Sequence, residues 1–383
     1  MANVGASRLP SLDALRGLIV VLMALDHAVF FVARRHPLEY WGTPPPQHQD
    51  AFWMLTRLSS HICAPGFFFL LGCGMALFSA SRREVGWSNG RITRHFLARG
   101  LVLLAIQQLV VNPAWFIGTF GSTAILGSAG PPGGGGMVYF NLDVLYGLGA
   151  CMIAMSFLLR ANGIVVAATS CAAIAATQVL TPRPEHVGTL YPPLERMLLI
   201  PGQTGILLVG YPIVPWLGVT GLGLVFGRRL LRHRDRAFRW LPAIGAASLT
   251  LFALLWGVWG VGNLRAPTGE GIADLLSLTK YPPSVAFLLF TCGVLALLLS
   301  LVARRQRPPG QRSPLLVFGS AALFFYVVHL YVYAVSGLPL PAGTGLVPTY
   351  LVWLVGLAVL YPLCAWYGAF KRRTAPDSAW RYF

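Results

Sequence analysis

Charge is scarce in this chain of 383 residues, and negative charge is scarcest. Only 11% of the residues are charged, with 12 Asp or Glu against 29 Lys or Arg. Hydrophobic residues make up 56% of the chain, and the mean hydropathy is +0.65. A water-soluble domain of this size does not normally tolerate such a composition. The lack of charge therefore excludes an ordinary soluble globular protein and indicates one that crosses the bilayer repeatedly.

Cysteine is also rare, and its six copies are scattered through hydrophobic stretches without the spacing of metal ligands. They are interpreted as small apolar packing residues, so neither a metal site nor a disulfide framework is expected.

The glycine-rich segment 127–136 lacks the Gly-Lys-Ser/Thr of a phosphate-binding loop, so it is interpreted as an outer loop. The N-terminal apolar run lacks a small-residue cleavage site, so we expect a first transmembrane helix there and not a signal peptide.

Long apolar runs are what the chain has in abundance. They predict an all-α, polytopic integral membrane protein with about ten transmembrane helices. The runs cover 12–34, 58–80, 95–118, 139–159, 163–180, 204–226, 241–260, 284–303, 313–336 and 347–370. No polar stretch between them is long enough for an independent core, so residues 1–383 are expected to form a single transmembrane domain.

Basic residues concentrate in alternate loops. Arginines crowd the segments 82–94, 228–239 and 304–312, and three more cations follow the last run at 371–373. With ten helices all these segments fall on one side, which the positive-inside rule assigns to the cytoplasm together with both termini. The expected location is the plasma (inner) membrane. Contact with cytoplasm and anionic lipid headgroups accounts for the formal charge of +17, so no nucleic-acid partner is expected.

Four ionisable residues, Asp13, Arg16, Asp26 and His27, interrupt the first apolar run. Ionisable groups at such depth cost about 3 kcal/mol or more each, and they are usually retained for chemistry, ion passage or a buried pair. At about 100° per residue, Asp13, Arg16 and His27 share one face of a helix. Asp26 points about a quarter-turn away, and we expect it to pair with Arg57 or Lys280. The first helix is therefore the first place to look for function.

More ionisable residues are expected at the depth of His27, which lies roughly 16 Å beyond Arg16 at about 1.5 Å per residue. They are Arg57, His61, Asp143, Lys280 and His329. Each also has an ordinary structural interpretation, as a snorkelling anchor, a helix cap or a packing residue. Asp26 and His27 are the hardest to explain in this way, because neither reaches an interface from its depth.

Several segments, taken together, are similar to the successive signatures of one family. They are RLPSLDALRGLIVVLMALDHA, TRLSSHICAPGFFFLLG, LARGLVLL, YPIVPWLGV, LTKYPPSVAFLLFTCG and FGSAALFFYVVHLYV. The chain thereby resembles bacterial heparan-α-glucosaminide N-acetyltransferase-like membrane proteins, within the wider group of transmembrane acyltransferases. The resemblance implies a membrane-embedded acyltransferase. It would move an acetyl group from cytosolic acetyl-CoA to a sugar or glycan acceptor at the outer face.

Transfer from a thioester requires cations for the CoA phosphates, a base for the acceptor and a polarised site for the oxyanion. We expect Arg16, Arg94 and Arg99 to bind the donor. The expected catalytic residues are His27, as the base or as an acyl carrier, with Asp26 and His61. The residues expected to contact the acceptor are Arg57, Asp143, Lys280, Tyr281 and His329.

Two other classes of function remain open from the sequence. A proton-coupled transporter would use the same buried Asp, His and Arg residues as a relay, with a discontinuous helix around 210–218 at its substrate site. A non-catalytic receptor or assembly subunit would tolerate the loss of His27. The sequence also leaves open the acceptor, the acyl length and whether the chain forms a homodimer.

Overall fold

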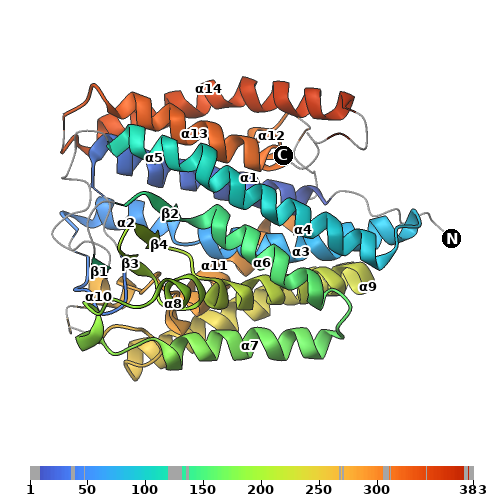
Figure 1. The fold of residues 1–383 in the computed structure, drawn as a ribbon, viewed down its shortest axis with the longest axis horizontal. Coiled ribbons are helices and arrows are strands. Elements are labelled where there is room, and N and C mark those ends of the chain that lie inside the picture. The colour runs from blue at the N-terminus through green and yellow to red at the C-terminus, as the bar shows by residue number, and fades with distance from the viewer. Residues whose placement is uncertain are drawn as a thin grey trace.

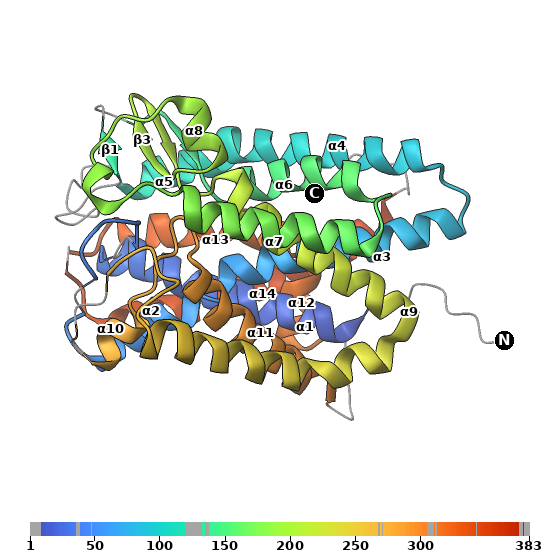
Figure 2. The same cartoon turned by 90° about the horizontal axis from the view of Figure 1, so that it is seen from below.

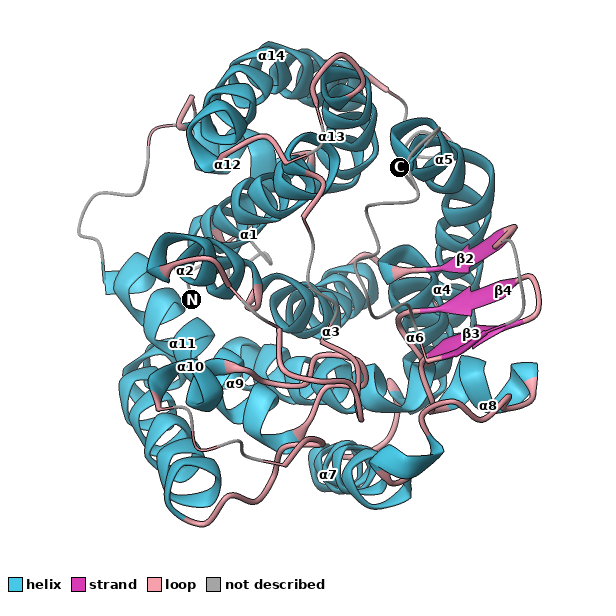
Figure 3. Cartoon of the chain, turned by 90° about the vertical axis from the view of Figure 1, so that its left-hand side faces the viewer, coloured by secondary structure: helices cyan, strands magenta, loops and turns pink. Residues whose placement is uncertain are grey.

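The fold is known from a computed structural model, which describes residues 9–35, 39–46, 48–119, 132–134, 138–266, 269, 271–304, 310, 312–341, 343–374 and 378. Long helices lie side by side and make up most of it (Figure 1). They are α1 (Pro10–Ala28), α3 (Cys63–Glu84), α4 (Asn89–Ile106), α6 (Val144–Leu158), α7 (Gly163–Leu180), α9 (Ile213–Phe252), α11 (Val285–Arg304), α13 (Ala322–Gly337) and α14 (Leu346–Arg373). Helix α3 lies near the middle of the bundle (Figure 3), where it contacts α1, α4, α6, α9 and α11.

Shorter helices extend or connect the long ones. They are α2 (Ala51–Ser60), α5 (Asn112–Thr119), α8 (Pro193–Leu198), α10 (Ile272–Leu276) and α12 (Pro314–Ser320). Segments of π-helix at Val29–Ala33, Gln107–Val111 and Ala253–Val258 prolong α1, α4 and α9, and a 3₁₀ turn covers Pro184–His186. Local signals account for several helix starts. Asp50 accepts hydrogen bonds from the backbone N–H groups of Phe52 and Trp53 at the start of α2, and Ser88 caps α4 in the same way.

Seven helices among the described residues are long and apolar enough to cross a membrane, or eight if the bent pair α12 and α13 forms one span. Helix α6 is apolar too but has only 15 residues. The prediction of a polytopic helical membrane protein is therefore confirmed. Three predicted runs agree closely with helices: 163–180 with α7, 284–303 with α11 and 347–370 with α14.

Helix α9 accounts for part of the difference between this count and the predicted ten. Its 40 residues include a break at His233, whose φ of −149° and ψ of 66° are not helical. The chain folds back at this point, so that the two arms of α9 run in opposite directions (Figure 2). The arginine-rich stretch 228–239 forms this turn, at the same end of the molecule as the connection between α3 and α4 (Figure 1).

A small sheet, which was not predicted, covers the opposite end of the bundle. Its strands, β1 (Gly133–Gly134), β2 (Phe140–Leu142), β3 (Gly202–Thr204) and β4 (Leu207–Val209), are arranged in the order β1-β3-β4-β2. Strands β3 and β4 are antiparallel, whereas β1–β3 and β2–β4 are parallel pairs. The predicted helix over 204–226 therefore began too early. Helix α9 starts only at Ile213, after Pro212, and it is continuous through 218, so the discontinuous helix expected around 210–218 is absent.

The discontinuity lies instead between α12 and α13, which meet at an angle of 99°. Helix α12 crosses α1 closely, because a Cβ atom on Gly17 would collide with the Leu315 carbonyl and one on Gly319 with the Asp13 carbonyl. Only glycine permits the two backbones to approach this far. The crossing fixes the start of α13 beside the first turns of α1, where Asp13 and Arg16 lie.

Candidate active site

A cavity of about 1650 Å³ lies between the α1–α12–α13–α14 side of the bundle and α3, α4, α6 and α9. This exceeds the roughly 300–1,000 Å³ of an ordinary small-molecule pocket. The basic residues that line it are Arg16, Arg82, Arg91, Arg94, Arg99, Arg232, Arg234 and Lys371, whereas its carboxylates are Asp13 and Glu84. The cavity is therefore suited to a large anion.

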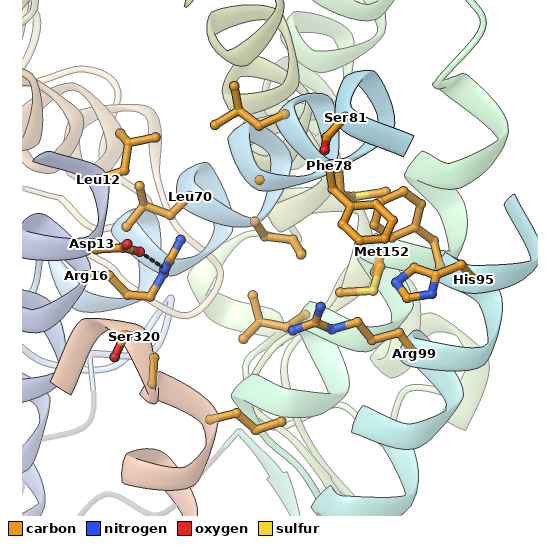
Figure 4. Close-up of a pocket in the computed structure, with 18 of the residues that line it drawn as sticks. Leu12, Asp13, Arg16, Leu70, Phe78, Ser81, His95, Arg99, Met152 and Ser320 are labelled. Atoms are coloured by element: carbon orange, nitrogen blue, oxygen red, sulfur yellow. Dashed lines mark hydrogen bonds and ion pairs between the residues drawn. The ribbon is translucent and has the colours of Figure 1, made fainter. Parts of the chain in front are cut away.

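The three arginines predicted to hold the donor, Arg16, Arg94 and Arg99, all line this cavity. Arg16 on α1 and Arg99 on α4 extend into it from opposite walls (Figure 4). Arg16 Nη1 donates to Asp13 Oδ1 at 2.7 Å and to the Gly319 carbonyl at 3.3 Å. Arg99 Nε is buried and has no hydrogen-bond partner among the described residues. A buried donor of this kind is costly unless a ligand supplies the acceptor.

The cavity extends from these arginines to the start of α6, at Val144 and Leu145, and to Tyr326 on α13. The ring of Tyr326 has its centroid 6.5 Å from that of His27 and 5.6 Å from that of His329. Tyr326 thus lies in the wall between the cavity and the two histidines.

His27 and His329 form a direct pair, although 302 positions separate them in the chain. Their rings stack at 4.9 Å, and His27 Nδ1 lies 2.6 Å from His329 Nε2. His329 Nδ1 lies 3.0 Å from the Phe325 carbonyl, which can only accept, so this nitrogen carries the proton. In the neutral ring with this proton on Nδ1, His329 Nε2 has the lone pair and accepts the N–H of His27 Nδ1. In neutral His27 the lone pair is therefore on Nε2.

A buried ionic cluster, made of Asp26, Glu39, Arg57 and His61, lies next to this pair in the chain. Arg57 Nη1 donates to Asp26 Oδ1 at 2.6 Å, and Arg57 Nε donates to Glu39 Oε1 at 2.6 Å. Arg57 Nη2 also contacts Glu39 Oε2, so this pair is bidentate. The predicted pairing of Asp26 with Arg57 is thus present, and the guanidinium is only 5% exposed. Arg57 therefore joins two buried carboxylates and is not a snorkelling anchor.

Glu39 joins this cluster from the loop between α1 and α2. Burial alone would raise the pKa of Glu39, but the Arg57 guanidinium and the hydrogen bonds from His61 and Arg57 hold it well below its ordinary value. Glu39 is therefore a carboxylate, and His61 Nε2 donates to its Oε1 at 3.3 Å. His61 Nδ1 is buried and has no hydrogen-bond partner in the described part of the chain. His61 thus resembles a base that a carboxylate orients.

Lys280 and Tyr281 adjoin the cluster through the backbone, since the N–H groups of both donate to the Glu39 carbonyl. Lys280 is buried, and its Nζ lies 5.1 Å from the centre of the Tyr281 ring. Asp143 is the N-cap residue of α6. Burial raises the pKa of Asp143 to about 6, although the Val144 N–H and Lys280 act in the opposite direction. The residues predicted to contact the acceptor therefore gather at one end of the bundle, except for His329, which pairs with His27.

A family model described as "Heparan-alpha-glucosaminide N-acetyltransferase, catalytic" matches residues 8–256, about two-thirds of the chain. The chain belongs to this family. It is accordingly a multi-pass membrane protein, and membership implies a transmembrane acetyltransferase whose family uses acetyl-CoA as donor. A comparison with curated proteins gave no match.

The match to the heparan-α-glucosaminide N-acetyltransferase family includes the complete ionic cluster, His27 and the three predicted donor-binding arginines. It ends before Lys280, Tyr281 and His329. Lys280 and Tyr281 join the site through their backbone hydrogen bonds to Glu39, and His329 joins it through its contact with His27.

Sequence reasoning missed three residues of this site: Glu39, Tyr326 and Trp115, whose ring lies 5.3 Å from that of His27. No motif in the sequence marks Glu39. Its one signal is that carboxylates are so rare in this chain. Nothing in the sequence distinguishes Tyr326 and Trp115 from the other aromatic residues of apolar helices.

Proposed function

We propose that this protein transfers an acetyl group from cytosolic acetyl-CoA to a sugar or glycan acceptor at the outer face of the membrane. One observation carries the proposal: a large cavity lined by arginines extends to Tyr326, directly beside the His27–His329 pair. The charged nucleotide end of a CoA thioester fits the basic end of such a cavity. Its long, thin pantetheine arm fits the apolar remainder.

In the proposed reaction, His27 Nε2 takes the proton from the acceptor hydroxyl or amine. The acceptor oxygen or nitrogen then forms a bond to the thioester carbonyl carbon, and the carbonyl π electrons move to its oxygen. When this oxyanion collapses, the carbon–sulfur bond breaks and the sulfur leaves with the electron pair. The proton held by His27 passes to the sulfur, so CoA departs as the thiol. His329 would act as a positioning residue, because its Nε2 holds the proton on His27 Nδ1.

The acceptor would approach from the end that carries the ionic cluster. Asp26 is adjacent to His27 in α1, and Arg57 fixes Asp26 in place. Glu39 and His61 bring a second acid–base pair to the same end. Sugars are recognised through hydroxyl groups, and a buried cluster of carboxylates, imidazole and guanidinium offers both donors and acceptors for them.

Acetyl transfer by the purified protein in detergent or vesicles tests this function directly. CoA release should depend on an added sugar, and radiolabel from [¹⁴C]acetyl-CoA should appear on that sugar. A transporter would move its substrate without consuming acetyl-CoA. Uptake into vesicles without CoA release would therefore reject the proposal in favour of transport.

Donor binding gives a first prediction. Replacing Arg16, Arg94 or Arg99 with Gln is expected to weaken acetyl-CoA binding about tenfold or more, because a charge-assisted contact to phosphate contributes about 1.5–3 kcal/mol. Isothermal titration calorimetry measures the affinity, and a melting curve verifies that each variant is folded. Unchanged affinity in all three variants would contradict this donor site.

The orientation of the chain gives a second prediction. We infer ten crossings, with the α3–α4 connection and the turn of α9 in the cytoplasm, because both are arginine-rich and lie at the same end of the molecule (Figure 1). A cysteine at Arg83 or Arg234 should react only with membrane-permeant maleimides in intact cells. A cysteine at Thr189, an exposed residue of the opposite end, should also react with impermeant ones. Labelling of position 234 from outside would overturn the ten-helix topology.

A further inference from the structure

A cluster of cations and aromatic rings lies where α3 ends and α4 begins. It comprises Phe78 and Arg82 on α3, Trp87 in the connection, and Arg91 and His95 on α4. Each helical pair is spaced by four residues, so both its members lie on one face of their helix. All five residues line the large cavity at its basic end. No binding or catalytic role was predicted for any of them.

The two guanidinium groups are held by the same indole. The Cζ of Arg91 lies 4.1 Å from the centre of the Trp87 ring, and the Cζ of Arg82 lies 5.4 Å from it. Arg82 also lies 5.1 Å from the centre of the Phe78 ring. A guanidinium stacked on a ring keeps the N–H groups at its edges available for other partners. Phe78 is in turn stacked on His95 at 4.5 Å, which fixes the ring (Figure 4).

No carboxylate forms an ion pair with Arg82 or Arg91 in the described part of the chain. Arg82 Nε is moreover buried without a hydrogen-bond partner there. Two cations on one indole repel each other, and a buried guanidinium N–H without an acceptor is costly. Both costs disappear if an anion binds between the two guanidinium groups.

The cations continue into the cavity along α4. Arg91, Arg94 and Arg99 lie on α4 and all line the cavity. At about 1.5 Å per residue they extend roughly 12 Å along its wall. A single small anion cannot contact a row of this length. A ligand with several phosphate groups does.

We propose that Arg82 and Arg91, stacked on Trp87, form a phosphate site for the nucleotide end of the donor. The site takes the phosphate at the nucleoside end, and the remaining phosphate groups of the donor continue inward to Arg94 and Arg99. This inference rests on the proposed function, because it states which part of the CoA thioester binds at the basic end of the cavity. A lipid headgroup offers the same phosphate chemistry, and the experiment separates the two sources.

The test uses adenosine 3′,5′-diphosphate, which carries nucleotide phosphates but has neither a pantetheine arm nor an acetyl group. The full-length protein in detergent should bind it, as measured by calorimetry. Arg82→Gln and Arg91→Gln should each weaken this binding about tenfold or more and weaken acetyl-CoA binding similarly. Both variants should leave the affinity for acetylpantetheine, which lacks the nucleotide, unchanged. Arg83→Gln is the matched control, because Arg83 is exposed, bonds Asn89 and does not line the cavity.

The possible failures are distinguishable. If the wild-type protein does not bind acetyl-CoA, the proposed function itself fails. If it binds acetyl-CoA but Arg82→Gln and Arg91→Gln retain full affinity for adenosine 3′,5′-diphosphate, the function stands and the phosphate site is wrong. Vesicles of phosphatidylcholine with and without phosphatidylglycerol test whether a lipid headgroup is the source of the phosphate. Displacement of the nucleotide by phosphatidylglycerol, lost in Arg91→Gln, would assign the site to a headgroup and overturn the inference.

Discussion

Replacing His27 with alanine is expected to lower the rate of acetyl transfer by about 10²–10⁴, the usual contribution of a general base. The affinity for acetyl-CoA should stay the same, because His27 is not one of the residues that line the cavity. The lone pair on Nε2 is the group that the substitution removes. Turnover and donor affinity, measured separately on purified protein, give the two quantities.

Two further variants sharpen this experiment. His329→Gln should lower the rate less than His27→Ala, since it removes only the acceptor that fixes the tautomer. His186→Ala is the control, because His186 lies in an exposed turn and its side chain is 58% exposed. Full activity in His27→Ala combined with loss in His61→Ala would transfer the role of base to the Glu39–His61 pair.

Replacing Arg57 with glutamine is expected to destabilise the folded protein by about 3–5 kcal/mol, because Asp26 and Glu39 would remain as buried carboxylates without a counter-charge. Thermal unfolding in detergent measures the loss. Because Arg57 joins α2 to α1 and to the loop of Glu39, its removal should also loosen the end of the bundle where the acceptor is expected.

The double variant Arg57→Gln, Glu39→Gln isolates the electrostatic cause. It removes one of the two uncompensated carboxylates, so it should recover part of the stability lost in Arg57→Gln. Arg35→Gln serves as the control, since Arg35 is exposed and its Cζ lies 5.5 Å from the centre of the Trp53 ring. A melting temperature of Arg57→Gln equal to that of the wild type would contradict the structural role of the cluster.

The long helices followed from the sequence because their cause is local. A run of apolar residues in lipid must satisfy its backbone hydrogen bonds within itself, and α7, α11 and α14 do so close to the predicted bounds. The first helix was likewise identified by its own residues. Its carboxylates, Arg16 and His27 are conspicuous in an apolar stretch, whatever surrounds them.

The small sheet and the break between α12 and α13 had no comparable signal. Strands of two or three residues exist only because β3 and β4 pair with segments that lie about 70 residues earlier in the chain. The bend at Ala321 depends on the close glycine crossing of α12 with α1. Such features are decided by what packs against a segment, and composition does not record this.

The sequence by itself determined that this protein spans the membrane repeatedly, which end is basic and which residues are too costly to bury without a purpose. Those properties follow from transfer free energies, which belong to single residues and short runs. Only the tertiary structure decided the partners: His329 for His27, Glu39 for Arg57, and Trp87 for Arg82 and Arg91. Hydrogen bonds and ion pairs act over about 3–4 Å, so they depend on the packing of segments that are far apart in the chain.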